Sequence, residues 1–159
     1  MKPCAVLPTL YKYPGTYKQF LNARRNYFEK QIFNVPFSLR GIPIRLIYHD
    51  KFDKCFDKFT IGSNKYHKTG TYDTMRLERL HWIDNLLNKI SRCKDAKACI
   101  GIKFIKEKRN KDNYLIIFCQ KNRYAMYLLD LTSKGYYVLT SAYYIHNDKK
   151  YNNYCNMSK

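Results

Sequence analysis

The chain has 159 residues, which is enough for one domain with a substantial hydrophobic core. Thirty Lys and Arg against 12 Asp and Glu give a formal net charge of +18, which excludes an ordinary near-neutral soluble protein and favours a polyanionic partner. Sixteen Tyr and nine Phe accompany this charge, and because bases stack on aromatic rings while cations hold phosphates, the combination favours nucleic acid over anionic lipid or an acidic protein.

The first half of the chain is predicted to be mainly helical. In chain order it comprises an irregular lead-in, an amphipathic helix, an edge strand, a short helix and a polar glycine-bounded loop, over residues 1–15, 16–32, 42–48, 49–62 and 62–70. Helical spacing of apolar residues defines the helices, and alternation defines the strand. Pro36 ends anything helical before it. Pro43 has no N–H to donate, which places its strand at a sheet edge.

The clearest helical pattern lies at residues 71–90 and predicts one continuous helix over residues 73–91, capped by Asp73 or Thr74. Its apolar residues recur on one face: Leu77, Leu80, Ile83, Leu87 and Ile90. Arg76 falls inside this apolar stripe and Arg79 on its flank. A guanidinium cannot lose its proton, so Arg76 needs either an ion pair with a nearby Asp or a route past the end of the core into a cleft.

The second half is predicted to consist of strands. They are expected at residues 99–105, 114–119, 124–131 and 136–145, with a charged turn at residues 106–113. Short links force neighbouring strands to run antiparallel. The fold class is therefore α+β, with N-terminal helices followed by a four- to five-stranded antiparallel sheet in a single domain over residues 16–146. Residues 147–159 are predicted to be a polar, frayed tail.

Several kinds of site find no support in the sequence. Six cysteines stand at irregular spacing without a CxxC pair, which favours reduced thiols in a cytoplasm and argues against zinc. No carboxylate pair stands at a spacing suited to a two-metal nuclease, and no phosphate-cradling GxxxxGK[ST] occurs. No apolar segment reaches signal-peptide length or the roughly 18 residues of a membrane span. We therefore expect no cofactor, no metal and no membrane span.

A metal-free ribonuclease needs only a base for the 2′-hydroxyl, an acid for the leaving 5′-oxygen and cations for the phosphate. His67 is the candidate proton-transfer group, because it lies in a basic loop with Lys65 and Lys68 and not among packing residues. A solvated loop histidine without a role is the alternative. The loop ends where the central helix begins, so we expect His67 and Lys68 to meet Arg76 in one cleft.

Two motifs carry a family resemblance. The helix reads Asp73-x-x-Arg76-x-x-Arg79-Leu-x-Trp82-Ile, and the last strand reads Tyr-Tyr-Val-Leu-Thr140-Ser-Ala-Tyr143. Over residues 65–145 the chain resembles the phage-barnase-type toxin nucleases, in the wider group of barnase, EndoU, colicin E5/D and RelE. Arg76, Arg79 and Trp82 match the helix motif, and Thr140 and Tyr143 match the strand motif. Leu80, His81 and Ser141 depart from the family pattern.

The resemblance, taken with the loop residues, implies a metal-independent endoribonuclease toxin domain that cleaves RNA, with tRNA as one candidate. The expected catalytic residues are His67, Arg76, Arg79, Thr140 and Tyr143, and the expected substrate-binding residues are Lys65, Lys68, Ser141 and Trp82. The resemblance also implies an acidic immunity or antitoxin protein as partner and a cytoplasmic site of action after delivery into a target cell.

Structural readings of the same residues stay open. Trp82 can serve only to pack its helix, and Thr140 is β-branched and suits any strand. Two rival functions also stay open: a non-catalytic nucleic-acid-binding module, and an effector that binds an acidic protein or a membrane surface. AT-rich codon usage is a further source of Lys and Tyr, although it explains the shortage of acidic residues less well.

Overall fold

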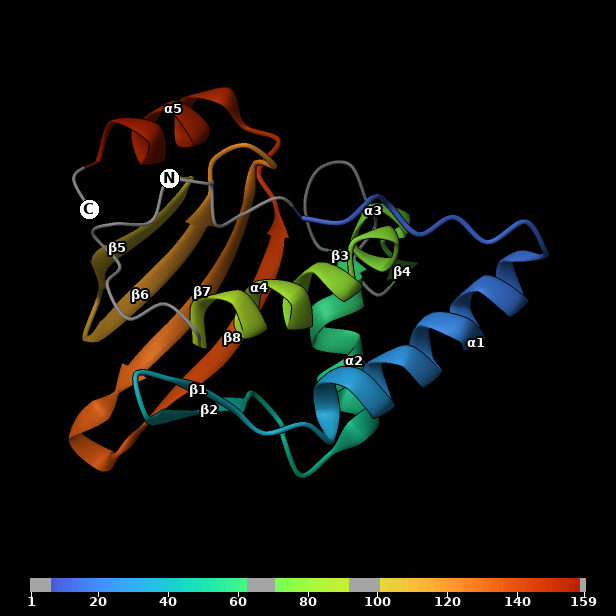
Figure 1. Ribbon diagram of the computed structural model, residues 1–159, viewed down its shortest axis with the longest axis horizontal. Helices are drawn as coiled ribbons and strands as arrows, with labels where there is room; N and C mark the ends of the chain where they lie inside the picture. The colour runs from blue at the N-terminus through green and yellow to red at the C-terminus, as the bar shows by residue number, and fades with distance from the viewer. Residues whose placement is uncertain (1–6, 63–70, 92–100, 158–159) are drawn as a thin grey trace.

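The computed structural model describes residues 7–62, 71–91 and 101–157 and shows an α+β fold with helices and a six-stranded mixed sheet (Figure 1). The strands of this sheet are β1 (Phe37–Leu39), β2 (Ile42–Leu46), β5 (Ile102–Arg109), β6 (Asp112–Cys119), β7 (Tyr124–Leu131) and β8 (Tyr136–Tyr144). The helices are α1 (Tyr17–Phe28), α2 (Phe52–Thr60), α3 (Thr74–Glu78), α4 (His81–Ser91) and α5 (Asp148–Asn156). A separate two-stranded pair joins β3 (Ile61–Gly62) to β4 (Thr71–Tyr72).

The sheet has the order β1-β2-β8-β7-β6-β5, and the prediction of a four- to five-stranded antiparallel sheet is wrong. Strand β2 runs parallel to β8, with Leu46 opposite Leu139. Strand β2 is also internal and not at an edge, because β1 pairs with its other side and places Ser38 opposite Pro43. Apolar alternation shows that residues 42–46 form a strand but carries no information about a partner so distant in sequence.

The strands from β5 to β8 form the predicted antiparallel meander, with one difference at the first hairpin. The charged and polar residues 106–109 and 112–113 extend β5 and β6, and the turn is confined to Asn110 and Lys111. Asn110 has a φ of 55°, a left-handed conformation that Asn tolerates better than most residues. Charged side chains near the end of a two-stranded hairpin reach solvent, so charge did not mark the turn here.

The predicted helix over residues 73–91 is two helices. Asp73 caps α3 by accepting hydrogen bonds from the backbone N–H groups of Met75 (2.9 Å) and Arg76 (3.4 Å). The helix ends at Arg79, and the chain turns through Leu80 before α4 begins. The apolar spacing survives the break because the Leu and Ile side chains of both helices stay buried. The break lets α3 contact β8 while α4 packs beside β1.

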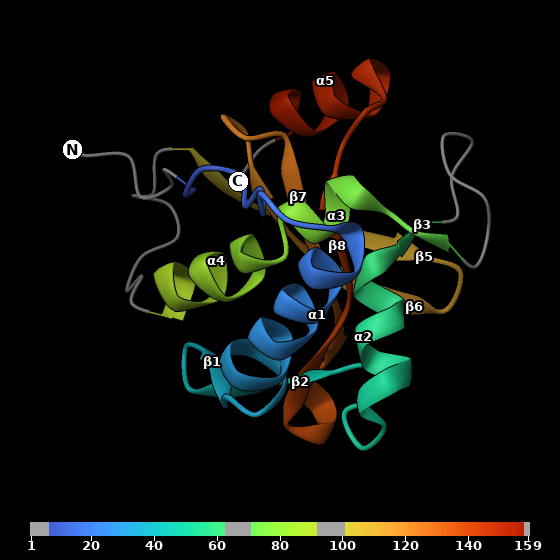
Figure 2. The same ribbon diagram turned by 90° about the vertical axis from the view of Figure 1, so that its right-hand side faces the viewer.

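Helices α1, α2 and α4 cover one face of the sheet (Figure 2). Phe28 of α1 is fully buried and its ring contacts those of Phe56 (5.5 Å) and Phe59 (6.0 Å) of α2. These aromatic rings meet Met126 and Leu139 from the sheet in one cluster. Burying each such side chain contributes roughly 1.5–3 kcal/mol, so this cluster is the main source of stability. Among the described residues no helix has the length and apolar character needed to cross a membrane.

The opposite face of the sheet carries α5, and the prediction of a frayed tail is wrong. Tyr154 is buried, with its ring 5.5 Å from that of Phe118 and its hydroxyl 3.2 Å from that of Tyr127. Tyr151 packs one helical turn earlier. Two tyrosines three residues apart lie on one face of a helix, and this spacing was the signal in an otherwise polar segment.

A buried polar network joins α1 to α4. Tyr27 donates to Asp84 (2.7 Å), and Arg24 lies 3.3 Å from Nδ1 of His81. The other nitrogen of His81, Nε2, lies 2.7 Å from the carbonyl oxygen of Thr9, which can only accept a hydrogen bond. Because the guanidinium of Arg24 can only donate to Nδ1, His81 is neutral and carries its proton on Nε2. Burial raises the pKa of Asp84 to about 6, despite the hydrogen bond from Tyr27.

This network predicts how stability depends on pH. Because the pKa of Asp84 is raised, the folded protein binds more protons than the unfolded chain between about pH 4 and pH 6, so Asp84 lowers the free energy of unfolding as the pH rises through that window. Asp84→Asn should remove this dependence. Between about pH 4 and pH 7, its free energy of unfolding should therefore rise relative to that of wild type by on the order of 1 kcal/mol. Denaturant titrations across that range measure the difference. Asp50→Asn, at an exposed position, is the control, and identical pH profiles for wild type and Asp84→Asn would contradict the prediction.

Candidate functional site

The site lies beside the part of β8 that continues beyond the end of its parallel neighbour, β2. Strand β2 pairs with β8 only as far as Leu139, and the N–H of Ile47 makes the last contact with the carbonyl of Leu139 (3.0 Å). Beyond that point α2 and α3, rather than a strand of the described sheet, lie beside this edge of β8. A pocket of about 420 Å³ opens there and is lined by Tyr48, Lys54, Asp57, Lys58, Ile61, Arg76, Ser141 and Tyr143.

A second, smaller cavity adjoins the pocket and shares Arg76 and Tyr143 with it. Its volume of about 20 Å³ leaves room for about one water molecule. Its other lining residues are Asp73, Met75, Arg79, Tyr124, Tyr144 and His146. We call the pocket and the cavity together the Arg76–Tyr143 site.

Arg76 both forms an ion pair with a nearby Asp and reaches a pocket, the two arrangements expected for an arginine in the apolar stripe. Its Nε lies 3.7 Å from a carboxylate oxygen of Asp73, and its side chain is 15% exposed. Its guanidinium carbon lies 5.2 Å from the centre of the Tyr143 ring, within the range of a cation–π contact. The ion pair therefore holds a mostly buried guanidinium in the lining shared by the pocket and the cavity.

Tyr143 has an unusually cationic environment. Its hydroxyl accepts a hydrogen bond from Nζ of Lys150 (2.9 Å), and its ring stacks on that of Tyr127 at 5.1 Å. Burial opposes ionisation of the phenol, but the hydroxyls and charges around it outweigh burial. The hydrogen bonds from Lys150 and Tyr127, with the charges of Lys150 and Arg109, lower the pKa of Tyr143 below its ordinary value. Of the two stacked phenols, Tyr143 therefore gives up its proton more readily, since burial raises the pKa of Tyr127.

Arg79 forms a wall of the small cavity. Its Nη1 donates to the carbonyl of Met75 (3.1 Å), and its guanidinium lies between the rings of Trp82 (5.2 Å) and Tyr144 (4.7 Å). Its buried Nε has no hydrogen-bond partner among the described residues. Arg76 and Arg79 thus both line the small cavity, and the side chain of Arg79 is held by more contacts.

Two of the predicted site residues, Thr140 and Trp82, make contacts that hold the fold together. Thr140 donates to the backbone carbonyl of Tyr127 (3.1 Å) at the irregular step between β7 and β8. Trp82 is buried, donates to the carbonyl of Pro8 (2.7 Å) and packs edge-on against Tyr124. Neither side chain lines the Arg76–Tyr143 site, whereas Ser141 lines the pocket. Thr140 and Trp82 are best explained by the alternatives of strand and helix packing.

The predicted loop residues Lys65, His67 and Lys68 lie outside the described residues, so their part in the site stays a prediction. Sequence reasoning missed four basic side chains that reach the site: Lys54, Lys58, His146 and Lys150. Lys54 and Lys58 are four residues apart on a predicted helix and therefore share a face, a signal that could have been used. Lys150 fell in the segment taken for a frayed tail, and His146 immediately precedes that segment.

Within the described ranges no group of three or more His, Cys, Asp or Glu side chains is placed to hold a metal ion. The cations of the site are Arg and Lys side chains, which supply positive charge and hydrogen-bond donors without any ion. No family model, curated protein or solved structure matches the chain. A proposal for the function therefore rests on the residues of the site.

Proposed function

We propose that this protein is a metal-independent endoribonuclease toxin domain related to the phage-barnase-type nucleases, acting at the Arg76–Tyr143 site. One observation carries the proposal: two arginines from α3 and its end, and Ser141 and Tyr143 from the end of β8, line the adjoining pocket and cavity of this site although more than sixty residues separate the two segments. These are the two segments whose motifs resemble that family. The net charge of +18 supplies attraction for the RNA backbone.

The reaction is cleavage of a phosphodiester by the neighbouring 2′-hydroxyl. A base removes the 2′-hydroxyl proton, the 2′-oxygen bonds to phosphorus, and the bond from phosphorus to the 5′-oxygen breaks while an acid protonates that oxygen. The products are a 2′,3′-cyclic phosphate and a 5′-hydroxyl. Arg76 and Arg79 stabilise the negative charge that gathers on the phosphate. Tyr143 and His146 are the proton-transfer side chains that line the site.

A purely binding protein is the rival, and the charge and aromatic content suit it equally well. The environment of Tyr143 favours the enzyme. A phenol that only stacks on a base needs no hydrogen bond from an ammonium group, whereas a phenol that exchanges a proton benefits from one. An acidic immunity or antitoxin protein that covers this basic site, and action in the cytoplasm of a target cell, belong to the same proposal.

The test is an RNA-integrity gel. Total RNA incubated with the protein and EDTA should be shortened, and its fragments should carry cyclic phosphate ends because the 2′-oxygen is the nucleophile. Arg45→Ala is a matched control, since it removes one exposed arginine of β2 outside the site and should leave cleavage intact. RNA that is bound and shifted but never shortened would establish the binding module in place of the enzyme.

A further inference from the structure

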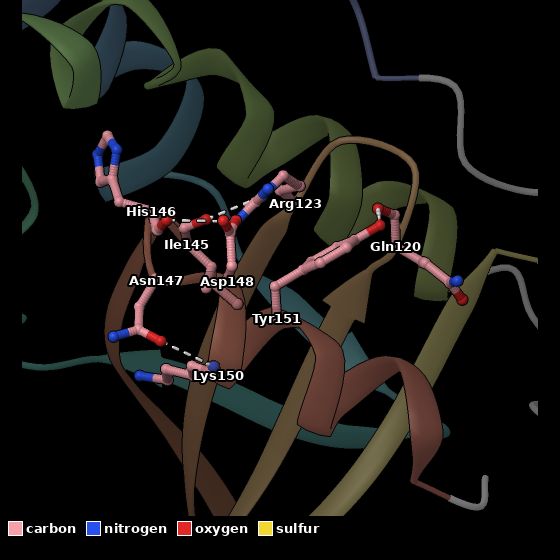
Figure 3. Close-up of polar contacts among 8 residues, drawn as sticks. All are labelled: Gln120, Arg123, Ile145, His146, Asn147, Asp148, Lys150 and Tyr151. Atoms are coloured by element: carbon pink, nitrogen blue, oxygen red, sulfur yellow. Dashed lines mark hydrogen bonds and ion pairs between the residues drawn. The ribbon is translucent and has the colours of Figure 1, made fainter.

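Helix α5 is fastened to the sheet at its start and near its end, so it holds its side chains in defined positions. Arg123 donates to the carbonyls of Ile145 (3.0 Å) and His146 (3.3 Å) and forms an ion pair with Asp148 (2.8 Å), as Figure 3 shows. Asn147 caps the helix by accepting from the backbone N–H of Lys150 (2.9 Å; Figure 3).

The second half of α5 is held by other contacts. Tyr151 donates to the carbonyl of Gln120 (3.2 Å; Figure 3), and Tyr154 lies buried against the sheet. Beyond the helix, Nζ of Lys103 donates to the carbonyl of Met157 (3.2 Å). A helix held in this way presents Lys150 to the sheet in one fixed register.

Lys150 points from α5 to the sheet, and its contacts there are with tyrosines. Its Nζ donates to the hydroxyl of Tyr143 (2.9 Å) and lies 5.3 Å from the ring centre of Tyr127 and 5.8 Å from that of Tyr154. Lys150 has no carboxylate partner among the described residues, and its side chain is half-buried. The nearest group able to take negative charge is therefore the phenol of Tyr143.

We propose that Lys150 is a positioning residue of the Arg76–Tyr143 site: its ammonium group fixes the Tyr143 hydroxyl and stabilises the phenolate that forms when Tyr143 gives up its proton. This role deepens the proposed ribonuclease function and, for its effect on RNA cleavage, rests on it. The charged and titratable groups that face Tyr143 from α5, the sheet and α3 include Lys150, Tyr127, Arg109 and Arg76. The other charged and titratable groups that line the pocket or the small cavity with Tyr143 are Tyr48, Lys54, Asp57, Lys58, Asp73, Arg79, Tyr124, Tyr144 and His146.

Among these groups, the ammonium of Lys150 makes direct contact with the phenol oxygen, and for this reason its effect should be the largest. Arg76 faces the ring, and Arg109 acts through its charge. A hydrogen bond to the charged form of a group favours that form, as does an opposite charge close by, and Lys150 supplies both. Tyr127, whose ring stacks on that of Tyr143, adds a hydrogen bond that also lowers the pKa of Tyr143.

The direct measurement is the titration of Tyr143, followed by NMR with tyrosine labelled at the ring carbon that bears the hydroxyl and assigned with Tyr143→Phe. In wild type, the pKa of Tyr143 should lie below the ordinary tyrosine value of about 10. Lys150→Met keeps the length of the side chain without its charge and should move the titration of Tyr143 up by about one pH unit or more. Lys150→Arg should restore most of the shift, and Lys149→Met, on the exposed side of the same helix, should leave it unchanged.

RNA cleavage by the same variants separates this inference from the proposed function. Lys150→Met should lower kcat about tenfold or more with little change in KM, because it acts on Tyr143 and not on RNA binding. If wild type cleaves no RNA but Tyr143 titrates as expected, the ribonuclease proposal fails and the Lys150–Tyr143 pair stands. If folded Lys150→Met leaves the titration unchanged, Lys150 only anchors α5 and the inference is overturned. Should Lys150→Met not fold, wild type decides, because a Tyr143 that titrates at or above the ordinary tyrosine pKa of about 10 overturns the inference as well.

Discussion

Replacing Arg76 with alanine is expected to slow RNA cleavage about a hundredfold or more while weakening RNA binding far less. Its guanidinium lines the pocket beside Tyr143, where the proposed reaction would place the negative charge of the phosphate. Removing one such preorganised donor typically costs a hundredfold to a thousandfold in kcat. RNA affinity should fall only modestly, because the other Lys and Arg residues still neutralise phosphates. Initial cleavage rates and a filter-binding titration at fixed salt measure the two effects.

Arg76→Lys is the informative companion variant. It keeps the charge but loses the planar fork that binds two phosphate oxygens, so its cleavage rate should fall between those of wild type and Arg76→Ala. Thermal unfolding serves as the control for folding, since Asp73 still caps α3 through the N–H of Met75 in both variants. A folded Arg76→Ala protein with full activity would show that the cleft is elsewhere.

Tyr143→Phe is expected to reduce cleavage by about a hundredfold or more, with RNA affinity and thermal stability close to those of wild type. The substitution removes only the hydroxyl, and the ring can still stack on Tyr127. Loss of a positioned proton-transfer group costs about a hundredfold to ten-thousandfold. The pH–rate profile of the residual activity should also lose one limb, because the group with the lowered pKa is gone.

Tyr136→Phe is the matched control for this variant. Tyr136 stands at the other end of β8, outside the Arg76–Tyr143 site, and the chemical change is the same. Its cleavage rate should equal that of wild type. Equal activity of Tyr143→Phe and Tyr136→Phe would remove Tyr143 from the reaction and leave it a packing role against Tyr127.

The elements that the sequence located best are those with strong local periodicity. The strand predicted at residues 124–131 coincides with β7, and the helix predicted from residue 16 begins at Tyr17 behind a Thr16 cap. Short or polar elements were missed: β1 has three residues, and α5 carries few apolar side chains. Two tyrosines and a sheet to receive them are enough to order α5, which periodicity over a long window does not detect.

The site was located in part. Arg76 stood out because a permanently charged side chain occupied an apolar stripe. In the structure it pairs with Asp73 and lines a pocket, so its charge is not buried in the core. The resemblance of the last strand to a family motif singled out Tyr143, which lines the site. Thr140 and Trp82 could not be separated from packing residues by pattern alone, because β-branched and aromatic side chains suit a core as well as a site.

By itself, the sequence determined the class of fold, the positions of the longer helices and strands, and an arginine at the start of the central helix that could not be an ordinary core residue. Local burial follows from side-chain periodicity, which is a property of a few neighbouring residues. Only the tertiary structure decided that β2 runs parallel to β8 and ends early, that the central helix breaks at Arg79, and that α5 brings Lys150 to Tyr143. Each of these depends on contacts between segments distant in the chain, whose free energy is set by how whole surfaces fit together and not by any local pattern.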